Sequence, residues 1–314
     1  MLKDCSRRLA HARRRTVATI AVIVPLSALV FASPAMAEPK GIFAIFKECP
    51  TEVAGVTLCS VDTTTSGKFT IGESTVPINK DVILQGGFVP VGESEVEYYG
   101  VPAKNGETLS KTELNVPGGL AGLIKCEEIT GEGLVEKAAR ALCKTTFENG
   151  VTGVTATTEL VANASNPLLF NEHYLATEQG TAVVLPIRVH LKNPLLGNNC
   201  YIGSESSPIE LHLTTGETHP PAGVTPLHGA TGTEETLEEN ELLSVRITGN
   251  SLVDNTFAVP GTEGCGELLL VKGFLDSIIN AKLKLPSEAG KNAAVLNGEL
   301  RAAAAEEVVE SESF

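Results

Sequence analysis

The sequence predicts a mainly β fold, an antiparallel β-sandwich or open barrel with two helical insertions. Three observations predict it: several stretches alternate apolar and polar residues, Val, Thr, Leu and Gly are abundant, and six cysteines follow an export signal. Alternation with a period of two means that one face of a strand is buried and the other is wet. Two further segments have apolar residues at helical spacing, and these are the expected insertions.

Six stretches carry the strand pattern. In the clearest one, Leu185, Ile187, Val189 and Leu191 share one face and polar residues occupy most of the other. The remaining stretches are a hairpin over 69–78 and single strands within 152–162, 209–213, 245–248 and 251–259. Pro186 has no backbone N–H to donate, so its strand is expected at a sheet edge or with a bulge at that position.

The two helical segments are 133–144 and 267–284. The second is apolar on nearly all sides, which is more than one packing partner requires. It is either buried between the sheet and a neighbouring helix, or it forms one wall of an apolar pocket or a docking face for another protein. The apolar segment 120–124 is the candidate for the facing wall. The residues expected to line this pocket or docking face are Leu268, Val271, Leu275 and Ile278.

The expected organisation is a signal peptide over 1–37, one β-rich domain over 38–301 and a tail over 302–314. Two small β domains divided near residue 148 are the alternative. Segment 216–233 is rich in Pro, Gly and Thr and is expected to be a loop. The glutamate-rich stretch 234–241 is expected to be a second loop with a solvated face rather than a cation site. The Ala- and Glu-rich end is expected to be a frayed tail or a marginal helix.

The N-terminal segment has the pattern of a cleaved secretory signal. Six basic residues stand against one acid, an apolar run follows over 17–32, and the small-residue triplet Ala35-Met36-Ala37 ends it. The run is too short for a membrane anchor and contains Pro25, so we expect cleavage after Ala37. General secretion and twin-arginine export both stay open. No later segment is long and apolar enough to predict a membrane span after cleavage.

Charge excludes one class of partner. The whole chain has a formal net charge of −14, and loss of six basic residues and one acid with the signal leaves about −19. A surface this acidic repels nucleic acid. The acids are nearly all glutamate, and no aspartate-rich calcium loop is present in the sequence. The charge is therefore expected to serve solubility.

Six cysteines remain after cleavage, and an even number in an exported chain predicts three disulfides. Six cysteines allow fifteen connectivities. We favour pairing between neighbours, because two of the resulting pairs each bracket one short local segment. The predicted bridges are Cys49 with Cys59, Cys126 with Cys143 and Cys200 with Cys265.

No catalytic, metal or cofactor motif is present in the sequence. It contains no G-x-S-x-G, H-E-x-x-H, P-loop or G-x-G-x-x-G pattern. His190 and His212 fall on the polar faces of two predicted strands and would hold a metal only if those strands placed them side by side. Solvated histidines are far commoner, so we expect no metal site, no cofactor and no enzymatic activity.

Four short phrases of the chain stand out together: Phe46-Lys47-Glu48-Cys49-Pro50, Gly197-Asn198-Asn199-Cys200-Tyr201-Ile202-Gly203-Ser204, the run 208–215, and Ala289-Gly290-Lys291-Asn292-Ala293-Ala294-Val295-Leu296-Asn297-Gly298. In these phrases the chain resembles a group of secreted actinobacterial proteins with no assigned activity. The resemblance implies a high-GC Gram-positive source and adds no function or catalytic residue.

Three functions follow, in order of preference. The first is a secreted, non-enzymatic structural or binding protein of the cell envelope or extracellular space, with a protein or an apolar small molecule as partner. The second is an extracellular carrier of an apolar small molecule, with the segment 267–284 as a pocket wall. The third is a hydrolase whose active-site residues are dispersed along the chain.

Overall fold

A computed structural model describes residues 38–94, 96–266 and 273–314. Within them, fourteen strands form one antiparallel sheet. The predicted signal peptide lies outside the described residues, and so do Leu268 and Val271. The strands are β1 (Leu58–Ile71), β2 (Ser74–Ile78), β3 (Val82–Pro90), β4 (Glu97–Pro102), β5 (Leu114–Asn115), β6 (Thr155–Leu160), β7 (Leu169–Asn171), β8 (Val183–Lys192), β9 (Tyr201–Ile202), β10 (Ile209–Leu213), β11 (Thr233–Glu239), β12 (Leu242–Asp254), β13 (Thr262–Glu263) and β14 (Ala293–Ala304).

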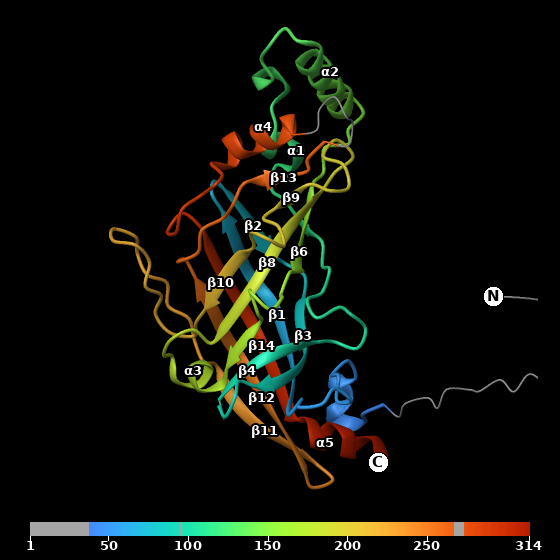
Figure 1. The fold of residues 1–314 in the computed structure, drawn as a ribbon, viewed down its shortest axis with the longest axis vertical. Helices are drawn as coiled ribbons and strands as arrows, with labels where there is room; N and C mark the ends of the chain where they lie inside the picture. The colour runs from blue at the N-terminus through green and yellow to red at the C-terminus, as the bar shows by residue number, and fades with distance from the viewer. Residues whose placement is uncertain (1–37, 95, 267–272) are drawn as a thin grey trace, which may run out of the picture. The chain divides into compact units, whose positions relative to one another are not determined.

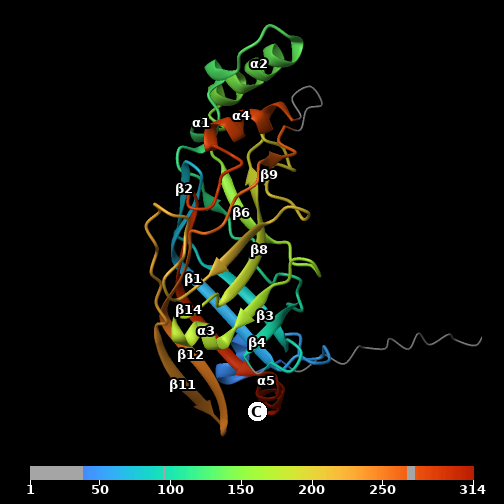
Figure 2. The same ribbon diagram turned by 60° about the vertical axis from the view of Figure 1, so that its left-hand side comes forward.

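The sheet folds over on itself, which confirms the predicted fold class. Its main path is β11-β12-β14-β1-β3-β4-β7-β8-β6-β5, and β10 pairs with β8. Strands β8 and β10 lie across the face of β1 and β14, and this arrangement creates two layers (Figures 1 and 2). The ladder does not close, but an isolated bridge between Thr214 and Val253 joins the end of β10 to β12. The inner faces of the two layers therefore enclose a common core.

Two β-bulges bend the sheet at one point of β14. The pairing of β1 with β14 shifts between Thr64 and Ser66, and the pairing of β12 with β14 shifts between Thr248 and Asn250. Both shifts lie opposite Gly298, where a Cβ atom would be 1.9 Å from the carbonyl oxygen of Thr63. Only glycine therefore fits there, and the bulges increase the local twist that folds the sheet over.

The two faces of this sheet pack against different partners. The inner face belongs to the large core between the layers, which includes Ile187, Leu211 and Leu300. The outer face around β1 carries a smaller cluster that includes Phe43, Phe46 and Val61, with residues of the C-terminal helix. Both clusters belong to one compact unit, Ala37–Phe314, and a single sheet continues through both sides of residue 148.

All three predicted disulfides are present. Their Cα–Cα distances are 5.6 Å for Cys49–Cys59, 5.7 Å for Cys126–Cys143 and 4.1 Å for Cys200–Cys265. The first attaches the segment before β1 to that strand, and the second attaches a 3₁₀ turn to a helix. Each bridge stabilises the fold mainly by restricting the unfolded chain.

The helices are short and lie outside the sheet. The predicted helix over 133–144 is observed as α2, and the described part of the predicted helix over 267–284 forms α4. No helix in the described part of the chain is long and apolar enough to cross a membrane. The helices are η1 (Gly41–Phe46), α1 (Gly119–Leu123), η2 (Cys126–Glu128), α2 (Leu134–Glu148), α3 (Glu172–Thr177), α4 (Phe274–Leu283), α5 (Ala305–Glu310) and η3 (Ser311–Ser313).

The C-terminal segment 302–314 is not a frayed tail. Its first residues complete β14, and α5 follows with Ala305 and Val308 buried in the outer cluster. Val308 is only 1% exposed. The Ala-rich composition predicted a weak helix, but the apolar face of this short helix gains its stability from packing on β1.

Two further predictions were wrong. Segment 234–241 is not a loop: most of it forms β11, an edge strand whose exposed Glu234, Glu235 and Glu238 discourage further pairing, while Glu239 accepts a hydrogen bond from the backbone N–H of Ile42. Strand β8 is not an edge strand, because it pairs with β10 on one side and with β6 and β7 on the other. On one side of β8, β7 pairs with residues 183–184 and β6 pairs with residues 187–192. Pro186 lies in the gap between these two pairings, so its missing N–H interrupts no regular ladder.

Candidate functional site

The candidate site is a pocket between the two layers, and the bulge in β1 determines which side chains reach it. Before the bulge, Asp62 and Thr64 face the inner core. The extra residue of the bulge reverses the alternation, so that Phe69 faces the same side afterwards. Without this reversal, the second half of β1 would turn Phe69 to the outside.

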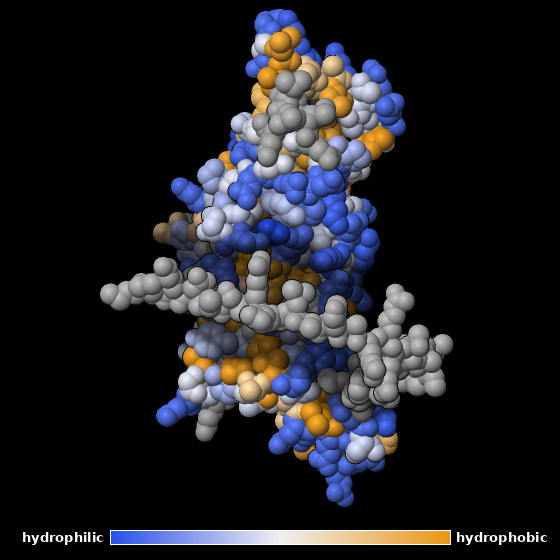
Figure 3. Space-filling model, turned by 45° about the vertical axis from the view of Figure 1, so that its right-hand side comes forward, coloured by the Kyte–Doolittle hydropathy of each residue, from blue (hydrophilic) through white to orange (hydrophobic). Residues whose placement is uncertain are grey.

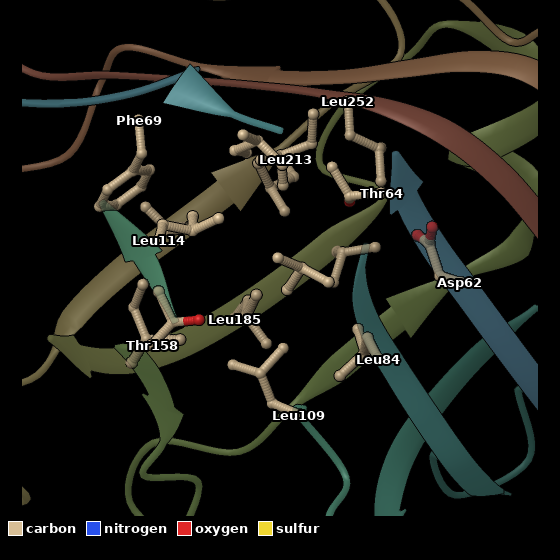
Figure 4. Close-up of a pocket in the computed structure, with 16 residues that line it drawn as sticks. Asp62, Thr64, Phe69, Leu84, Leu109, Leu114, Thr158, Leu185, Leu213 and Leu252 are labelled. Carbon is tan, nitrogen blue, oxygen red and sulfur yellow. The ribbon is translucent and has the colours of Figure 1, made fainter. Parts of the chain in front are cut away.

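The pocket is apolar and has a volume of about 70 Å³. Strands of both layers line it, and most of their contributions are Leu, Ile or Val. Figure 4 shows Asp62 at one end and Phe69 with Thr158 at the other. The lining residues are Asp62, Thr64, Phe69, Ile78, Val82, Leu84, Leu109, Leu114, Thr158, Val183, Leu185, Ile187, Leu211, Leu213, Leu252 and Leu296. One water molecule needs about 10–15 Å³ on such a measure, so there is room for about five water-sized groups.

Asp62 is the one titratable side chain among the described residues that line the pocket. Leu300 on β14 and Leu84 on β3 are its direct cross-strand neighbours. No described residue donates a hydrogen bond to its carboxylate or forms an ion pair with it. Burial among apolar groups raises the pKa of Asp62 to about 7, from an ordinary value of 3.8. By its accessible surface Asp62 is half-buried, and it lines the pocket.

This arrangement can bind a polar group but has few means to transform one. A carboxyl with a pKa near neutrality accepts a hydrogen bond or balances a positive charge when ionised, and donates one hydrogen bond when protonated. The described lining adds two threonine hydroxyls, Thr64 and Thr158, but no histidine, cysteine or second carboxylate. General acid–base work on a substrate usually needs a second positioned group.

Two neighbouring hollows adjoin the pocket. A second apolar cavity of about 50 Å³ shares Phe69, Leu114 and Thr158 with it. On the outside, a hollow of about 320 Å³ near β4 and β6 shares Leu109. Leu109 forms an isolated bridge with Leu84 and is 8% exposed. It therefore separates the inner pocket from the outer hollow.

A polar cluster covers the outer side of β6 and β8. Arg188 donates to Glu159 through Nη2 at 2.8 Å, and His190 Nδ1 lies 3.5 Å from the same carboxylate. Arg188 also lies over the ring of Tyr201, at 4.2 Å from its centroid, and His190 stacks on that ring. Burial holds the pKa of His190 below its ordinary value despite Glu159. The ion pair, the cation–π contact and the ring stacking hold these side chains together, but His190 Nε2 is buried without a hydrogen-bond partner among the described residues. We assign the cluster to stability.

The structure does not bring the two candidate histidines together. His190 pairs with Tyr201 across β8 and β9, whereas His212 pairs with Val184 across β10 and β8. His212 lies instead 2.9 Å from Glu210 on its own strand. Within the described ranges, no group of three His, Cys, Asp or Glu side chains is placed to hold a metal ion.

The predicted pocket wall on α4 occupies a different place from the pocket found here. Leu275 is 1% exposed and belongs to the inner core. Ile278 borders an open hollow of about 440 Å³ on the surface, together with Glu73 and Lys282. Segment 120–124 is largely α1, which contacts α4 and contributes Leu120 and Leu123 to the core.

Other apolar groups reach the surface at the end of the molecule that carries α2 (Figure 3). Leu134, at the start of α2, is 85% exposed. One exposed side chain of this kind is ordinary for a protein surface. We therefore do not treat this end as a site.

Sequence reasoning missed Asp62, although a signal was present. Aspartate is depleted in strands, and Asp62 stands alone in a run of Ser, Val and Thr with strong strand propensity. An acid in such a run is placed either on a wet face or at a functional position.

No protein-family model, curated protein or solved structure matches this chain.

Proposed function

We propose that this protein is an exported, non-enzymatic binding protein that carries a small, mainly apolar molecule in the pocket beside Asp62. The observation that carries the proposal is the pocket itself, a mainly apolar space between two packed layers. The proposal follows the second of the functions considered above, but with a different pocket wall. Export is supported by the signal pattern over 1–37 and by three disulfides in the remaining chain.

An empty pocket destabilises the fold. Protein interiors are normally packed as densely as organic crystals. At about 24 cal/mol per Å³, a void of about 70 Å³ costs about 1.5–2 kcal/mol. A half-buried carboxyl without a partner among the described residues adds to this cost. A ligand that fills the space and contacts the carboxyl offsets both, which is a physical reason for a sequence to keep them.

The volume determines the size of the ligand. Pockets for drug-sized molecules measure about 300–1,000 Å³. With the strands in their observed positions, this pocket admits about five non-hydrogen atoms. A ligand this small gains at most about 1.5 kcal/mol per atom. We expect dissociation constants of about 0.1–10 mM for simple probes of this size.

The test is a titration of the mature protein, residues 38–314, with 1-butanol, followed by NMR of methyl-labelled Leu and Val. We expect saturable shifts at the methyls of Leu84, Leu185 and Leu213, which line the pocket. Leu185→Phe fills the space and abolishes them. Leu243→Phe is the matched control, because Leu243 is 45% exposed on β12 and outside the pocket lining. Absence of saturable shifts at pocket methyls in the wild type would contradict the proposal.

Native mass spectrometry of the protein secreted by its host tests export and cargo together. We expect a chain that begins at Glu38, a mass six hydrogens below that of the reduced form, and a small bound molecule. An intact Met1 terminus or six free thiols would rule out the exported state.

A further inference from the structure

We infer that the ligand of the inner pocket carries a basic nitrogen, and that Asp62 balances the charge of a small aliphatic ammonium group. This inference rests on the proposed function, since it names the ligand class for the same pocket. It is argued from the charge, the hydrogen-bonding capacity and the size of the site.

The described lining of the pocket contains one acid, Asp62, and no basic side chain to balance its charge. Every other described residue in the lining is apolar or is a threonine. The cross-strand neighbours Leu84 and Leu300 offer neither charge nor a hydrogen-bond donor. An ionised carboxylate in such surroundings is unfavourable unless it is paired. A positively charged ligand supplies the pair that the described part of the fold does not.

The hydrogen-bond acceptors near Asp62 favour an ammonium group over other cations. An alkylammonium has three N–H donors and an apolar chain. Asp62 offers two acceptor oxygens, and Thr64, two residues further along the same face of β1, offers a hydroxyl oxygen. The leucines of both layers remain for the alkyl chain. One end of the pocket is thus polar and the rest is apolar, as an aliphatic amine requires.

Two other cation classes fit less well. Calcium takes six to eight oxygen ligands and magnesium six, whereas the described lining has one carboxylate and two hydroxyls at opposite ends. A guanidinium group carries five N–H donors in a rigid plane, more than these acceptors satisfy. An uncharged alcohol fits the space but leaves the ionised carboxylate without a counter-ion.

Proton balance gives the inference a distinctive signature. Below pH 7, Asp62 in the empty pocket holds a proton. Binding of an alkylammonium ion at that pH displaces this proton to solvent, one for each ligand bound. Above pH 7 the carboxylate is already ionised, and binding releases no proton. No other titratable side chain of the described lining faces Asp62, so the signature belongs to this group.

The experiment compares n-butylamine with 1-butanol, which have nearly the same size and shape. For the wild type we expect butylamine to bind at least tenfold more tightly than butanol at pH 8. Its affinity falls about tenfold for each pH unit below 7, while that of butanol changes little. Calorimetry in buffers of different ionisation enthalpy is expected to detect the release of one proton per butylamine at pH 5.5.

Two matched acid-to-amide variants locate the effect. Asp62→Asn is expected to remove the preference for butylamine and its pH dependence. Glu299→Gln is expected to keep both, because Glu299 faces the other side of β14 and pairs with Arg246. The measurements are made at 0.15 M salt, where attraction of amines to the acidic surface is screened.

The outcomes separate the two proposals. If butanol shifts the pocket methyls and butylamine binds no better at pH 8, the inference is overturned and the binding function stands. An unchanged amine preference in Asp62→Asn would also overturn it. If neither probe shifts the pocket methyls, the binding function itself fails.

Discussion

The two faces of strand β1 serve opposite purposes although they belong to one backbone. On the outer face, Cys59 and Val61 pack against the 3₁₀ helix η1 and the helix α5, and they are 0% and 5% exposed. On the inner face, Asp62 and Thr64 border an apolar pocket. The Cys49–Cys59 disulfide cross-links the outer cluster. The inner face, in contrast, borders the pocket and carries the carboxyl of Asp62, which has no partner among the described residues. One face therefore stabilises the fold, whereas the other carries the features on which the proposed binding function rests.

Under the proposed function, one sheet combines rigidity on one face with binding on the other. Residues that alternate along a strand belong to different packing environments, so a costly site on one face is supported by a close-packed cluster on the other. Bound ligand and packed side chains then contribute separately to stability. Substitutions on the two faces are expected to have separable effects.

The largest effect is expected on the outer face. Phe43 is fully buried, and its ring centroid lies 6.4 Å from those of Phe46 and Phe314. Phe43→Ala removes this packing and is expected to lower the free energy of unfolding by about 3–5 kcal/mol. Urea denaturation at pH 7 measures the change.

Tyr99→Ala is the control for Phe43→Ala. Tyr99 is 44% exposed on β4, so its loss is expected to cost less than about 1 kcal/mol. The folded Phe43→Ala protein is expected to bind 1-butanol as the wild type does. A loss of binding there, in protein that is still folded, would show that the two faces are coupled.

The next effect concerns Asp62 and the pH dependence of stability. The folded pKa of about 7 lies above the ordinary value of 3.8, so between these limits the folded state holds a proton that the unfolded state has lost. The free energy of unfolding therefore falls as pH rises from 4 to 7, and the loss is complete above 7. The increase in the pKa of Asp62 corresponds to a loss of about 4 kcal/mol in the free energy of unfolding. Water that enters the pocket reduces this loss, so we expect about 2–4 kcal/mol.

Asp62→Asn supplies the reference for this measurement. Chemical denaturation of both proteins at pH 4, 5.5, 7 and 8.5 is expected to give curves that diverge as pH rises, with the variant the more stable above pH 7. Parallel curves across this range would mean that Asp62 titrates as an exposed carboxyl does, and the interpretation of the pocket would then be wrong.

The sequence predicted the features that depend on local pattern. Alternation in β8 and β10 identified two strands with one buried face each, and short separations made two of the disulfide pairs plausible. The pocket was not predictable in this way, because it depends on which distant strands become neighbours. Asp62 owes its surroundings to Leu300, more than two hundred residues away.

The bulge in β1 marks a place where strict alternation does not predict which face a residue occupies. A strict period of two places Asp62 and Phe69 on opposite faces, but the extra residue between Thr64 and Ser66 brings both to the pocket. The bulge lies where β1 pairs with Gly298, and this pairing joins residues that are far apart in the sequence. Local sequence patterns report burial but not the insertion of one residue into a ladder.

The smallest effects come from exchanging Val and Thr, which have the same shape, on the two faces of β1. Val61→Thr introduces a hydroxyl into the close-packed outer cluster, where it is expected to cost about 1–3 kcal/mol. Thr64→Val removes a hydroxyl from the pocket and is expected to change the free energy of unfolding by less than about 1 kcal/mol. Thr64→Val is also expected to weaken butylamine two- to fivefold and to leave butanol nearly unchanged, because one acceptor of the ammonium group is lost. Urea denaturation and the NMR titration measure both quantities. Equal costs for the two exchanges would mean that the faces are packed alike, and the contrast from which the binding site was inferred would disappear.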